Sequence, residues 1–316
     1  MDFAESVKKF TFVEAVKDFP LGRATTLRVG GNADYLVETE RASDVKAAAE
    51  LCADFNIPLF VLGGGSNLVV SDGGFRGVAL RLKNAEITLR EGCIHAGAGA
   101  KLSNLIAFCE NNAIKGYSFL AGIPATVGGA TYMNVGAFNH SFSDLVLSVT
   151  TVKGGKLCKY KREECAFSYR KSRFSYDKKR ATVNVSSRPL YNPAQTEIII
   201  SVDLKADCGN KKLIIAERED CFAYRKISQP SGRTCGSVFK NPKGYYAGEL
   251  IEKVGLKGYT VGGAKISEKH ANFIVNVGGG TAKDVASLIE KAKTEVYGKF
   301  GITLSEEIEY LGDKSV

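Results

Sequence analysis

The chain has 316 residues, of which 44% are hydrophobic and 24% charged. This composition is typical of a globular protein and excludes a disordered or collagen-like chain. The length is enough for about two domains. The formal net charge of +9 fits either a field that attracts small anionic substrates or a basic surface for nucleic acid. Because the Lys and Arg residues are scattered and form no long basic run, small anions are the preferred interpretation.

The cysteines and the uncharged segments bear on where the protein works. Eight cysteines form no CxxC pair, which favours reduced thiols of a cytoplasmic protein over a disulfide framework or a zinc site. The first residues lack the apolar core of a signal peptide. The longest stretch without a charged residue, 116–143, contains Pro124, five glycines and several polar residues, so we do not expect it to span a membrane. We expect it to line a buried ligand site.

The predicted elements of the first two thirds follow from apolar periodicity and glycine turns. A helix over 43–55 precedes short strands at 58–62, 68–70, 77–82, 87–90 and 93–96. A helix over 101–113 is followed by a segment of loop and short helix up to residue 139. A hairpin around Gly154-Gly155, a helix or turn at 161–175 and a strand at 197–204 complete this part.

The remaining third reads as a compact α/β unit. A charged helix at 211–226 leads into a Gly/Ser/Pro loop, and we place the main domain boundary near 207–214. A helix at 246–254 ends before Gly255, and a strand follows at 272–277. Thr281 and Asp284 form a capping-box pattern at the start of the next helix. A final strand at 303–311 would place Glu307 and Glu309 on one face by alternation.

Several common signatures are absent. No GxGxxG motif, no Walker A loop and no GxSxG elbow occurs in the sequence, so a Rossmann dinucleotide site, a P-loop and a hydrolase nucleophile are unsupported. Instead, Gly63-Gly64-Gly65-Ser66-Asn67 lies between two apolar strands. Such a loop is either a nest of backbone amides for a pyrophosphate or simply a tight turn.

Further patterns are compatible with a ligand site, although each has a structural explanation as well. The segment from Gly122 to Ala137 is rich in small residues, which would let an extended cofactor approach the backbone, or would allow a tightly packed crossover. The run Tyr169-Arg170-Lys171-Ser172-Arg173 is either functional or a solvated basic turn.

Taken in order, these segments resemble the UDP-N-acetylenolpyruvoylglucosamine reductase (MurB) family over nearly the whole chain. The blocks that carry the resemblance are VLGGGSNLVVSD, AGIPATVGG, SYRKSRF, CGSVFKNP, GGAKISEKHANFIVN and LSEEIEYLG. The resemblance implies an α+β fold: two FAD-binding subdomains of the vanillyl-alcohol-oxidase (PCMH) type and a C-terminal α/β substrate-binding domain. We assign 1–84 and 85–207 to the two subdomains and 208–316 to the third domain.

The family reaction reduces the enolpyruvyl ether of UDP-N-acetylglucosamine to UDP-N-acetylmuramate in peptidoglycan synthesis, with FAD as cofactor and NADPH as co-substrate. The resemblance implies three catalytic residues. Arg170 would stabilise the enolate that follows hydride addition, Ser237 would donate the proton, and Glu307 would assist the enolate. Glu307 is preferred to its neighbours Glu306 and Glu309 because it matches the second acid of the family pattern.

The resemblance also implies binding residues. The cofactor set consists of Gly63, Gly64, Gly65, Ser66, Asn67, Gly122, Ile123, Thr126, Gly128, Gly129, Asn134, Gly136, Ala137 and Arg225. The substrate set consists of Tyr169, Asn241, Lys265 and His270, for which structural hydrogen bonding around the cleft is an equal alternative. No metal ligand is implied. The expected partners are small molecules, with no nucleic acid and no membrane, and a monomer is expected.

This sequence departs from the family pattern at several places. Phe138-Asn139-His140 stands where Tyr-Gly and then Glu are usual, and Glu249 stands where lysine is common. Compared with the shorter (type II) members, the chain has an insert at roughly 174–196 that contains Tyr176 and Tyr191. The alternatives are another FAD-dependent oxidoreductase of the same fold, which would not need the Arg170, Ser237 and Glu307 set, and a basic nucleic-acid-binding protein without a chromophore.

Overall fold

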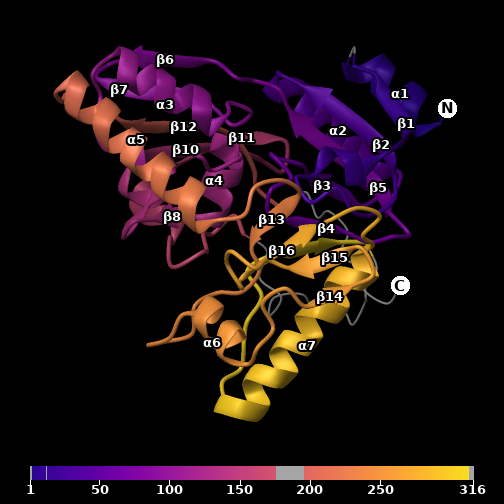
Figure 1. Cartoon of the computed structure of the whole chain (residues 1–316). Helices are drawn as coiled ribbons and strands as arrows, with labels where there is room; N and C mark the ends of the chain where they lie inside the picture. Colours follow the sequence, from indigo (N-terminus) through magenta and orange to yellow (C-terminus); the bar gives the residue numbers. More distant parts are fainter. Residues whose placement is uncertain (1, 12, 176–195, 313–316) are drawn as a thin grey trace.

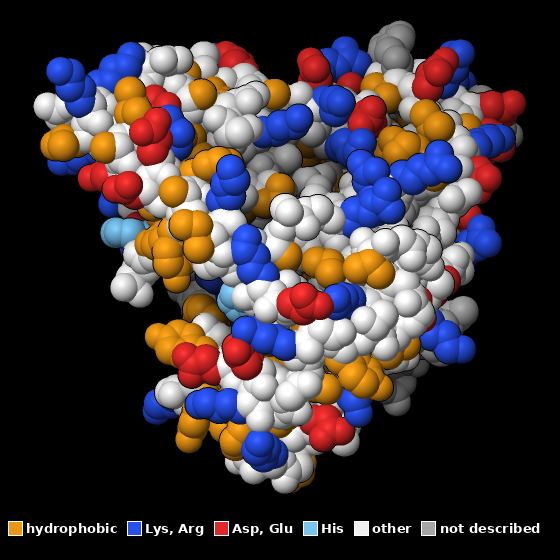
Figure 2. Space-filling model, viewed as in Figure 1, with side chains coloured by type: hydrophobic (Ala, Val, Ile, Leu, Met, Phe, Trp, Pro, Cys, Tyr) orange, Lys and Arg blue, Asp and Glu red, His pale blue; other side chains and the backbone are white. Residues whose placement is uncertain are grey.

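The structure is a computed structural model that describes residues 2–11, 13–175 and 196–312. The chain forms three lobes (Figure 1), and the face shown in Figure 2 is hollowed between the first and second lobes. The first lobe is built on a mixed sheet with strand order β1-β2-β5-β3. Its elements are α1 (Phe3–Thr11), β1 (Ala15–Phe19), β2 (Ala33–Thr39), α2 (Ala42–Asp54), β3 (Leu59–Val61), β4 (Leu68–Val70) and β5 (Phe75–Leu82).

The second lobe contains an antiparallel sheet with strand order β11-β10-β12-β7-β6. Its elements are β6 (Ile87–Arg90), β7 (Cys93–Gly97), α3 (Leu102–Asn111), α4 (Val127–Met133), β8 (Gly136–Ala137), β9 (His140–Ser141), β10 (Val146–Lys153), β11 (Lys156–Lys161) and β12 (Ile198–Lys205). One buried cluster runs through both lobes, from Val7 and Val45 to Leu105 and Val202. The two lobes therefore share a continuous core.

The third lobe consists of a small antiparallel sheet covered by helices (Figure 1). Its elements are β13 (Thr234–Ser237), α6 (Ala247–Lys253), β14 (Thr260–Val261), β15 (Ala264–Ile266), β16 (Phe273–Asn276), α7 (Ala282–Phe300) and β17 (Glu309–Leu311). Helix α5 (Lys211–Ser228) precedes this lobe in the chain and packs on the second lobe, against α3 and the 3₁₀ turn Ser118–Leu120.

Most predicted elements are confirmed with small shifts at their ends. Thr281 caps α7, and its side chain and that of Asp284 exchange hydrogen bonds with the backbone as a capping box does. Gly255 has φ +76° just after α6, as expected of a residue that ends a helix. The segment 161–175 contains a 3₁₀ turn at Arg162–Cys165 and no α-helix. All eight cysteines are free, as predicted.

The predicted continuous strand at 303–311 is wrong. Only Glu309–Leu311 form a strand, β17, which pairs in parallel with β4 of the first lobe. A bend at Ile308 precedes β17. The preceding residues run beside the segment after β13, through an isolated bridge between Phe239 and Glu306. The segment is divided because its two halves find hydrogen-bonding partners in different lobes.

No described helix is long and apolar enough to cross a membrane.

Candidate active site

Arg170 and Glu307 meet in a half-enclosed ion pair. Arg170 Nε donates to Glu307 Oε1 at 2.7 Å, and Arg170 Nη2 donates to the carbonyl of Gly136 at 2.8 Å. Their side chains are 18% and 13% exposed, which shields the pair from most of the solvent. Because two nitrogens of the planar guanidinium bind two different acceptors, the orientation of the group is fixed. The third nitrogen, Nη1, donates no hydrogen bond to any described residue.

A tight turn positions Arg170. The amide of Ser168 donates to the carbonyl of Lys171, and the amide of Lys171 donates to the carbonyl of Ser168, so only Tyr169 and Arg170 lie in the loop. Arg170 has φ +52°, in the left-handed region that non-glycine residues rarely adopt. The side chain of Asn134 donates to the carbonyl of Ser168 at 2.9 Å and accepts from the amide of Ser143 at 2.9 Å. Asn134 thus anchors the turn that carries Arg170.

Ser237 lies next to this pair through the backbone. It ends β13, and the adjacent residue Val238 accepts a hydrogen bond at its carbonyl from the amide of Glu307 at 2.8 Å. The Ser237 hydroxyl has no hydrogen-bond partner within the described ranges. The structure therefore brings together all three predicted catalytic residues, from segments that are far apart in the sequence.

The geometry also separates Glu307 from the neighbouring acids. Glu306 pairs with Lys293 of α7, and Glu309 accepts a hydrogen bond from the hydroxyl of Tyr132 at 3.1 Å. Only Glu307 of the three pairs with Arg170 among the interactions that the structure records. This supports the choice of Glu307 from the sequence.

Burial is the largest influence on Glu307 and raises the pKa of its carboxyl group above the ordinary value. The charge and hydrogen bond of Arg170, and more weakly the charge of Lys240, pull that pKa down without cancelling the effect of burial. Lys240 was not among the residues singled out in the sequence. Its position three residues after Ser237, in the same block, is the signal that could have identified it.

The Gly63–Asn67 loop lies against the segment that begins α4. A Cβ on Gly64 would lie 2.8 Å from the carbonyl oxygen of Pro124, and Gly65 has φ +63°, so both positions require glycine. The amides of Gly64, Gly65 and Ser66 donate no hydrogen bond to any described residue. Unused amides that follow one another in a glycine loop fit a pyrophosphate group.

Asn67 joins this loop to the predicted catalytic residue Glu307. Its side chain donates to the carbonyl of Glu307 at 3.1 Å, and its own carbonyl accepts from the amide of Glu309 at 3.0 Å. Thr126 caps α4 by accepting from the amide of Gly129 at 3.2 Å, and a Cβ on Gly63 would lie 3.2 Å from the Thr126 hydroxyl oxygen. The two predicted cofactor segments and the ion pair are thus parts of one site.

The remaining cofactor candidates line the same region in different ways. The Gly136 carbonyl is bound by Arg170, and a Cβ on Gly136 would lie 2.9 Å from Arg170 Nη1. Gly128 packs closely on Ala98, where a Cβ would meet the side chain at 2.9 Å. Arg225 lies on α5 and donates from Nη2 to the carbonyl of Phe119 at 3.2 Å. Ile123 and Ala137 pack against the core that the first two lobes share.

The substrate candidates are less closely grouped. The hydroxyl of Tyr169 accepts from the amide of Asn241 at 3.4 Å, which brings these two together beside Arg170. The Asn241 side chain accepts from the amide of Ala247 at the start of α6. His270 Nδ1 accepts from the amide of Asn272 at 3.2 Å, and burial lowers the pKa of the imidazole. Asn241 and His270 therefore have structural partners of their own.

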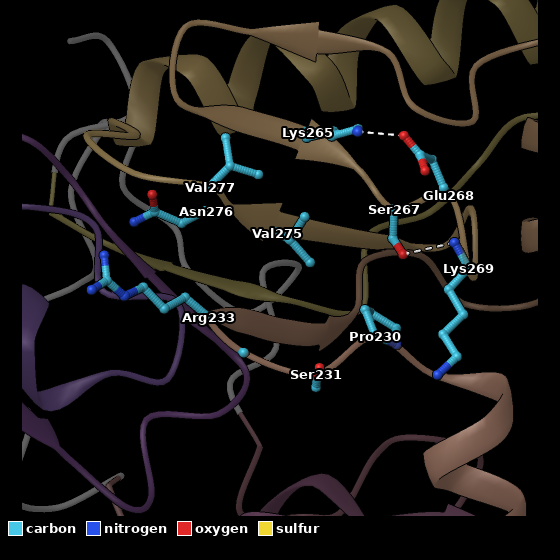
Figure 3. A pocket seen from close by; sticks show the side chains of 11 residues that line it. Pro230, Ser231, Arg233, Lys265, Ser267, Glu268, Lys269, Val275, Asn276 and Val277 are labelled. Carbon is cyan, nitrogen blue, oxygen red and sulfur yellow. Dashed lines mark hydrogen bonds and ion pairs between the residues drawn. The ribbon is translucent and has the colours of Figure 1, made fainter.

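Lys265 lines an open pocket of about 600 Å³ on the third lobe (Figure 3). The pocket lies between the loop that contains Pro230 and Arg233 and the sheet of β15 and β16, and Lys265 forms an ion pair with Glu268 on its wall. Val275 lies directly opposite both Lys265 and Thr234 in this sheet. Residues paired across neighbouring strands point to the same face of a sheet. The side chains of Thr234, Val275 and Lys265 therefore lie on one face, and the pocket is on that face.

The departures from the family pattern have definite places. Phe138 and Asn139 form the two-residue turn between β8 and β9. Glu249 lies exposed on α6, 4.0 Å from the amino group of Lys253. Tyr176 and Tyr191, and most of the predicted insert, lie outside the described residues. Within the described ranges no group of three His, Cys, Asp or Glu side chains is arranged to hold a metal ion.

Comparisons with known proteins identify the family of the chain. The model of the C-terminal domain of UDP-N-acetylenolpyruvoylglucosamine reductase matches residues 228–311, and the model of an FAD binding domain matches residues 33–157. The reductase of Lachnoclostridium phytofermentans is 37% identical over 303 residues, which cover 93% of this chain and 92% of that protein. That of Anoxybacillus flavithermus is 38% identical over 294 residues, which cover 92% of each chain.

A solved structure extends the similarity to three dimensions. The crystal structure of the reductase (MurB) from Thermus caldophilus has a TM-score of 0.76 and 34% sequence identity, and the match covers 95% of this chain and 99% of that one. The predicted fold, two FAD-binding subdomains and a C-terminal substrate domain, and the predicted FAD cofactor are confirmed. The chain belongs to the UDP-N-acetylenolpyruvoylglucosamine reductase family.

Proposed function

We propose that this protein reduces UDP-N-acetylglucosamine enolpyruvate to UDP-N-acetylmuramate, with FAD as cofactor and NADPH as reductant, in peptidoglycan synthesis. The observation that carries the proposal is the ion pair of Arg170 with Glu307, together with the hydrogen bond from the amide of Glu307 to the carbonyl of Val238, the residue that follows Ser237. A different oxidoreductase of the same fold would not need this arrangement. The proposed setting is the cytoplasm, the proposed partners are small molecules rather than nucleic acid or membrane, and the proposed state is a monomer.

The residues fit FAD in the same site. The amides of Gly64, Gly65 and Ser66 would hold the pyrophosphate, and the segment from Gly122 to Gly129 would line the extended cofactor. When bound, FAD supplies the hydride that it receives from NADPH. The division at residues 84 and 207 remains a proposal, with α5 attached to the second lobe by packing.

Each catalytic residue has a distinct proposed task. Hydride addition to C3 of the enolpyruvyl group leaves negative charge on C2 and on the carboxylate. The Arg170 guanidinium, held in plane by Glu307 and Gly136, would bind this planar dianion and stabilise it. Ser237 would then give its proton to C2, which is basic enough to accept it from a hydroxyl group. Glu307 would assist by holding Arg170 in this orientation.

The test separates the two half-reactions. The wild-type holoenzyme is expected to show flavin bands that bleach with NADPH under anaerobic conditions and recover when the enolpyruvyl sugar nucleotide is added. Ser237→Ala should keep the NADPH step close to the wild-type rate, while reoxidation by the sugar nucleotide should fall by about 10²–10⁴-fold, the usual contribution of a positioned proton donor.

Stopped-flow absorbance measures both steps, and Ser287→Ala, on the exposed side of α7, is the matched control. Equal loss of both half-reactions in Ser237→Ala would make the serine structural. Flavin bands that do not respond to NADPH would favour another oxidoreductase of this fold. A protein that stays colourless with added FAD would contradict the proposal altogether.

A further inference from the structure

Phe138 and Tyr224 form an exposed aromatic pair beside the active site, which we call the aromatic platform. Phe138 lies in the β8–β9 turn and Tyr224 lies near the end of α5, and their ring centroids are 5.5 Å apart in an edge-to-face arrangement. Phe138 is 39% exposed and Tyr224 is 60% exposed. Figure 2 shows hydrophobic side chains gathered on this face, where Figure 1 places β8 and the end of α5. The rings are therefore accessible to a ligand.

The backbone under Phe138 is unusual for an aromatic residue. Phe138 has φ +52° and Asn139 has φ +62°, as both central residues of this type of two-residue hairpin turn require. Asn suits that conformation, whereas a bulky residue does not. The ring is held by its contact with Tyr224 and by the Arg225 guanidinium, which lies 5.5 Å from the ring centroid. A costly conformation thus presents this ring at the surface.

Arg225 adds to the platform a cation whose hydrogen-bond donors are only partly used. Its Nε is buried and has no hydrogen-bond partner among the described residues, although Nη2 donates to Phe119. Burial is the main reason that the pKa of Arg225 is lowered, and the charge of Arg170 lowers it further. Two arginines close enough to repel, one with an unpartnered N–H, favour an anion between or beside them.

The platform connects directly to the catalytic residues. Gly136, which accepts a hydrogen bond from Arg170, begins the hairpin whose turn contains Phe138. Gly122 lies on the other side, where a Cβ would meet Arg225 Cδ at 3.1 Å and Phe222 Cδ2 at 3.3 Å. A ligand at Arg170 that extends toward the surface along Gly136 would reach this pair of rings.

We propose that the aromatic platform stacks with the heteroaromatic base of a phosphate-bearing nucleotide whose anionic group faces Arg225. The inference rests on the proposed function, in which NADPH and the UDP-sugar are the two nucleotides that enter the cleft. Both combine a planar base with phosphate groups, the chemistry that two exposed rings and a guanidinium recognise. The experiment decides which of them supplies the base.

The test uses the FAD-loaded full-length protein and two changes at one position. Phe138→Gly removes the ring and favours the turn, whereas Phe138→Tyr keeps a ring. Stopped-flow bleaching at increasing NADPH concentration gives the Kd for NADPH, and UDP titration of the flavin spectrum gives the Kd for UDP. In Phe138→Gly we expect about tenfold weaker binding of one nucleotide, within the range for a lost base–aromatic stack. Phe138→Tyr should stay within about twofold of wild type.

Tyr224→Leu provides a second variant that leaves the turn intact, and Leu213→Ala, an exposed apolar position at the other end of α5, is the control. Weaker NADPH binding assigns the platform to the reductant, and weaker UDP binding assigns it to the substrate. Unchanged Kd values for both nucleotides in Phe138→Gly and Tyr224→Leu would overturn the inference, as would a loss confined to flavin occupancy. If NADPH did not bleach the flavin bands of the wild-type protein, that result would instead contradict the proposed function.

Discussion

Arg170 depends on a small number of neighbours for its orientation. Its backbone is in the left-handed region at φ +52°, which costs a non-glycine residue roughly 1–2 kcal/mol. The two hydrogen bonds between Ser168 and Lys171, together with the Asn134 side chain, hold the turn in this conformation. The turn thus pays a conformational cost so that the guanidinium meets Glu307 and Gly136 at the same time.

Removal of the Arg170 charge should shift the titration of Glu307. Burial raises the pKa of Glu307 and Arg170 lowers it, so Arg170→Gln should raise this pKa further and keep the carboxyl protonated to higher pH. Infrared spectroscopy can follow the carbonyl band of the protonated acid against pH, with Glu307→Gln to assign the band. We also expect reoxidation by the sugar nucleotide to slow by about 10²–10³-fold.

Arg76→Gln, which removes an exposed arginine paired with Asp34 on the first lobe, is the control. A carboxyl titration that is the same in Arg170→Gln and wild type would show that the ion pair does not influence Glu307.

At the scale of elements, one carboxylate ties together the sheet of the second lobe. Asp203 on β12 accepts from Ser148 on β10 at 2.7 Å and lies 2.9 Å from the amino group of Lys159 on β11. It also lies 2.8 Å from His95 Nδ1 on β7. Burial alone would raise the pKa of Asp203, but these hydrogen bonds lower it to about 2. A single side chain thus links four strands.

The low pKa of Asp203 predicts how the stability of the protein depends on acid. A carboxyl group with a lowered pKa in the folded state stabilises it fully above the ordinary value of 3.8, and this contribution is lost as the pH falls toward about 2. Because the site is partly exposed, we expect Asp203→Asn to lower the free energy of unfolding at pH 7 by about 1–2 kcal/mol. Urea unfolding from pH 7 to pH 2.5 should show the difference shrink below pH 4; a constant difference would exclude the linkage.

Elements could be predicted from the sequence where the interactions that form them lie within one segment. The helices α2 and α3 follow from apolar spacing within each segment, and α7 follows from apolar spacing and its Thr281 cap. The Gly63–Asn67 loop follows from its own composition. The prediction of one continuous strand at 303–311 failed because it used only the alternation of residues within that segment. The backbone partners of the segment lie on β4 and after β13. Periodicity within a segment does not contain that information.

Contacts between distant segments are even more important in the candidate active site, and local sequence patterns do not predict them. Arg170 and Glu307 are 137 positions apart, so no spacing rule joins them, and only the resemblance to a family did. Lys240 was missed, and Phe138 was noted only as a departure. The contact of Phe138 with Tyr224 depends on how α5 packs on the second lobe, which the sequence of the turn does not reveal.

At the scale of the whole molecule, the first and third lobes are joined by backbone as well as side chains. Strand β17 pairs with β4, and the core of the third lobe includes Leu27 and Val69 of the first. The Asp72 carboxylate accepts from the amides of Ala282 at 2.8 Å and Lys283 at 3.1 Å at the start of α7. An acid from one lobe therefore supplements the cap of a helix in another.

Asp72→Ala should weaken this connection. The loss of a carboxylate at a helix N-terminus costs about 0.5–2 kcal/mol, so we expect a corresponding fall in the free energy of unfolding measured in urea. Asp72→Asn should recover part of the loss because its amide oxygen still accepts a hydrogen bond. Asp54→Ala, at the end of α2, is a control. Equal stability of Asp72→Ala and wild type would show that Thr281 and Asp284 cap α7 without help.

The β4–β17 pairing also imposes an order on synthesis of the protein. The glycine loop ends at Asn67, where β4 begins, and Asn67 binds the backbone of both Glu307 and Glu309. The ribosome makes these partners more than two hundred residues apart, so the loop leaves the exit tunnel long before Glu307 is added. A nascent chain therefore cannot form the contacts between this loop and the 307–309 segment until Glu307 and Glu309 have been translated and have left the exit tunnel.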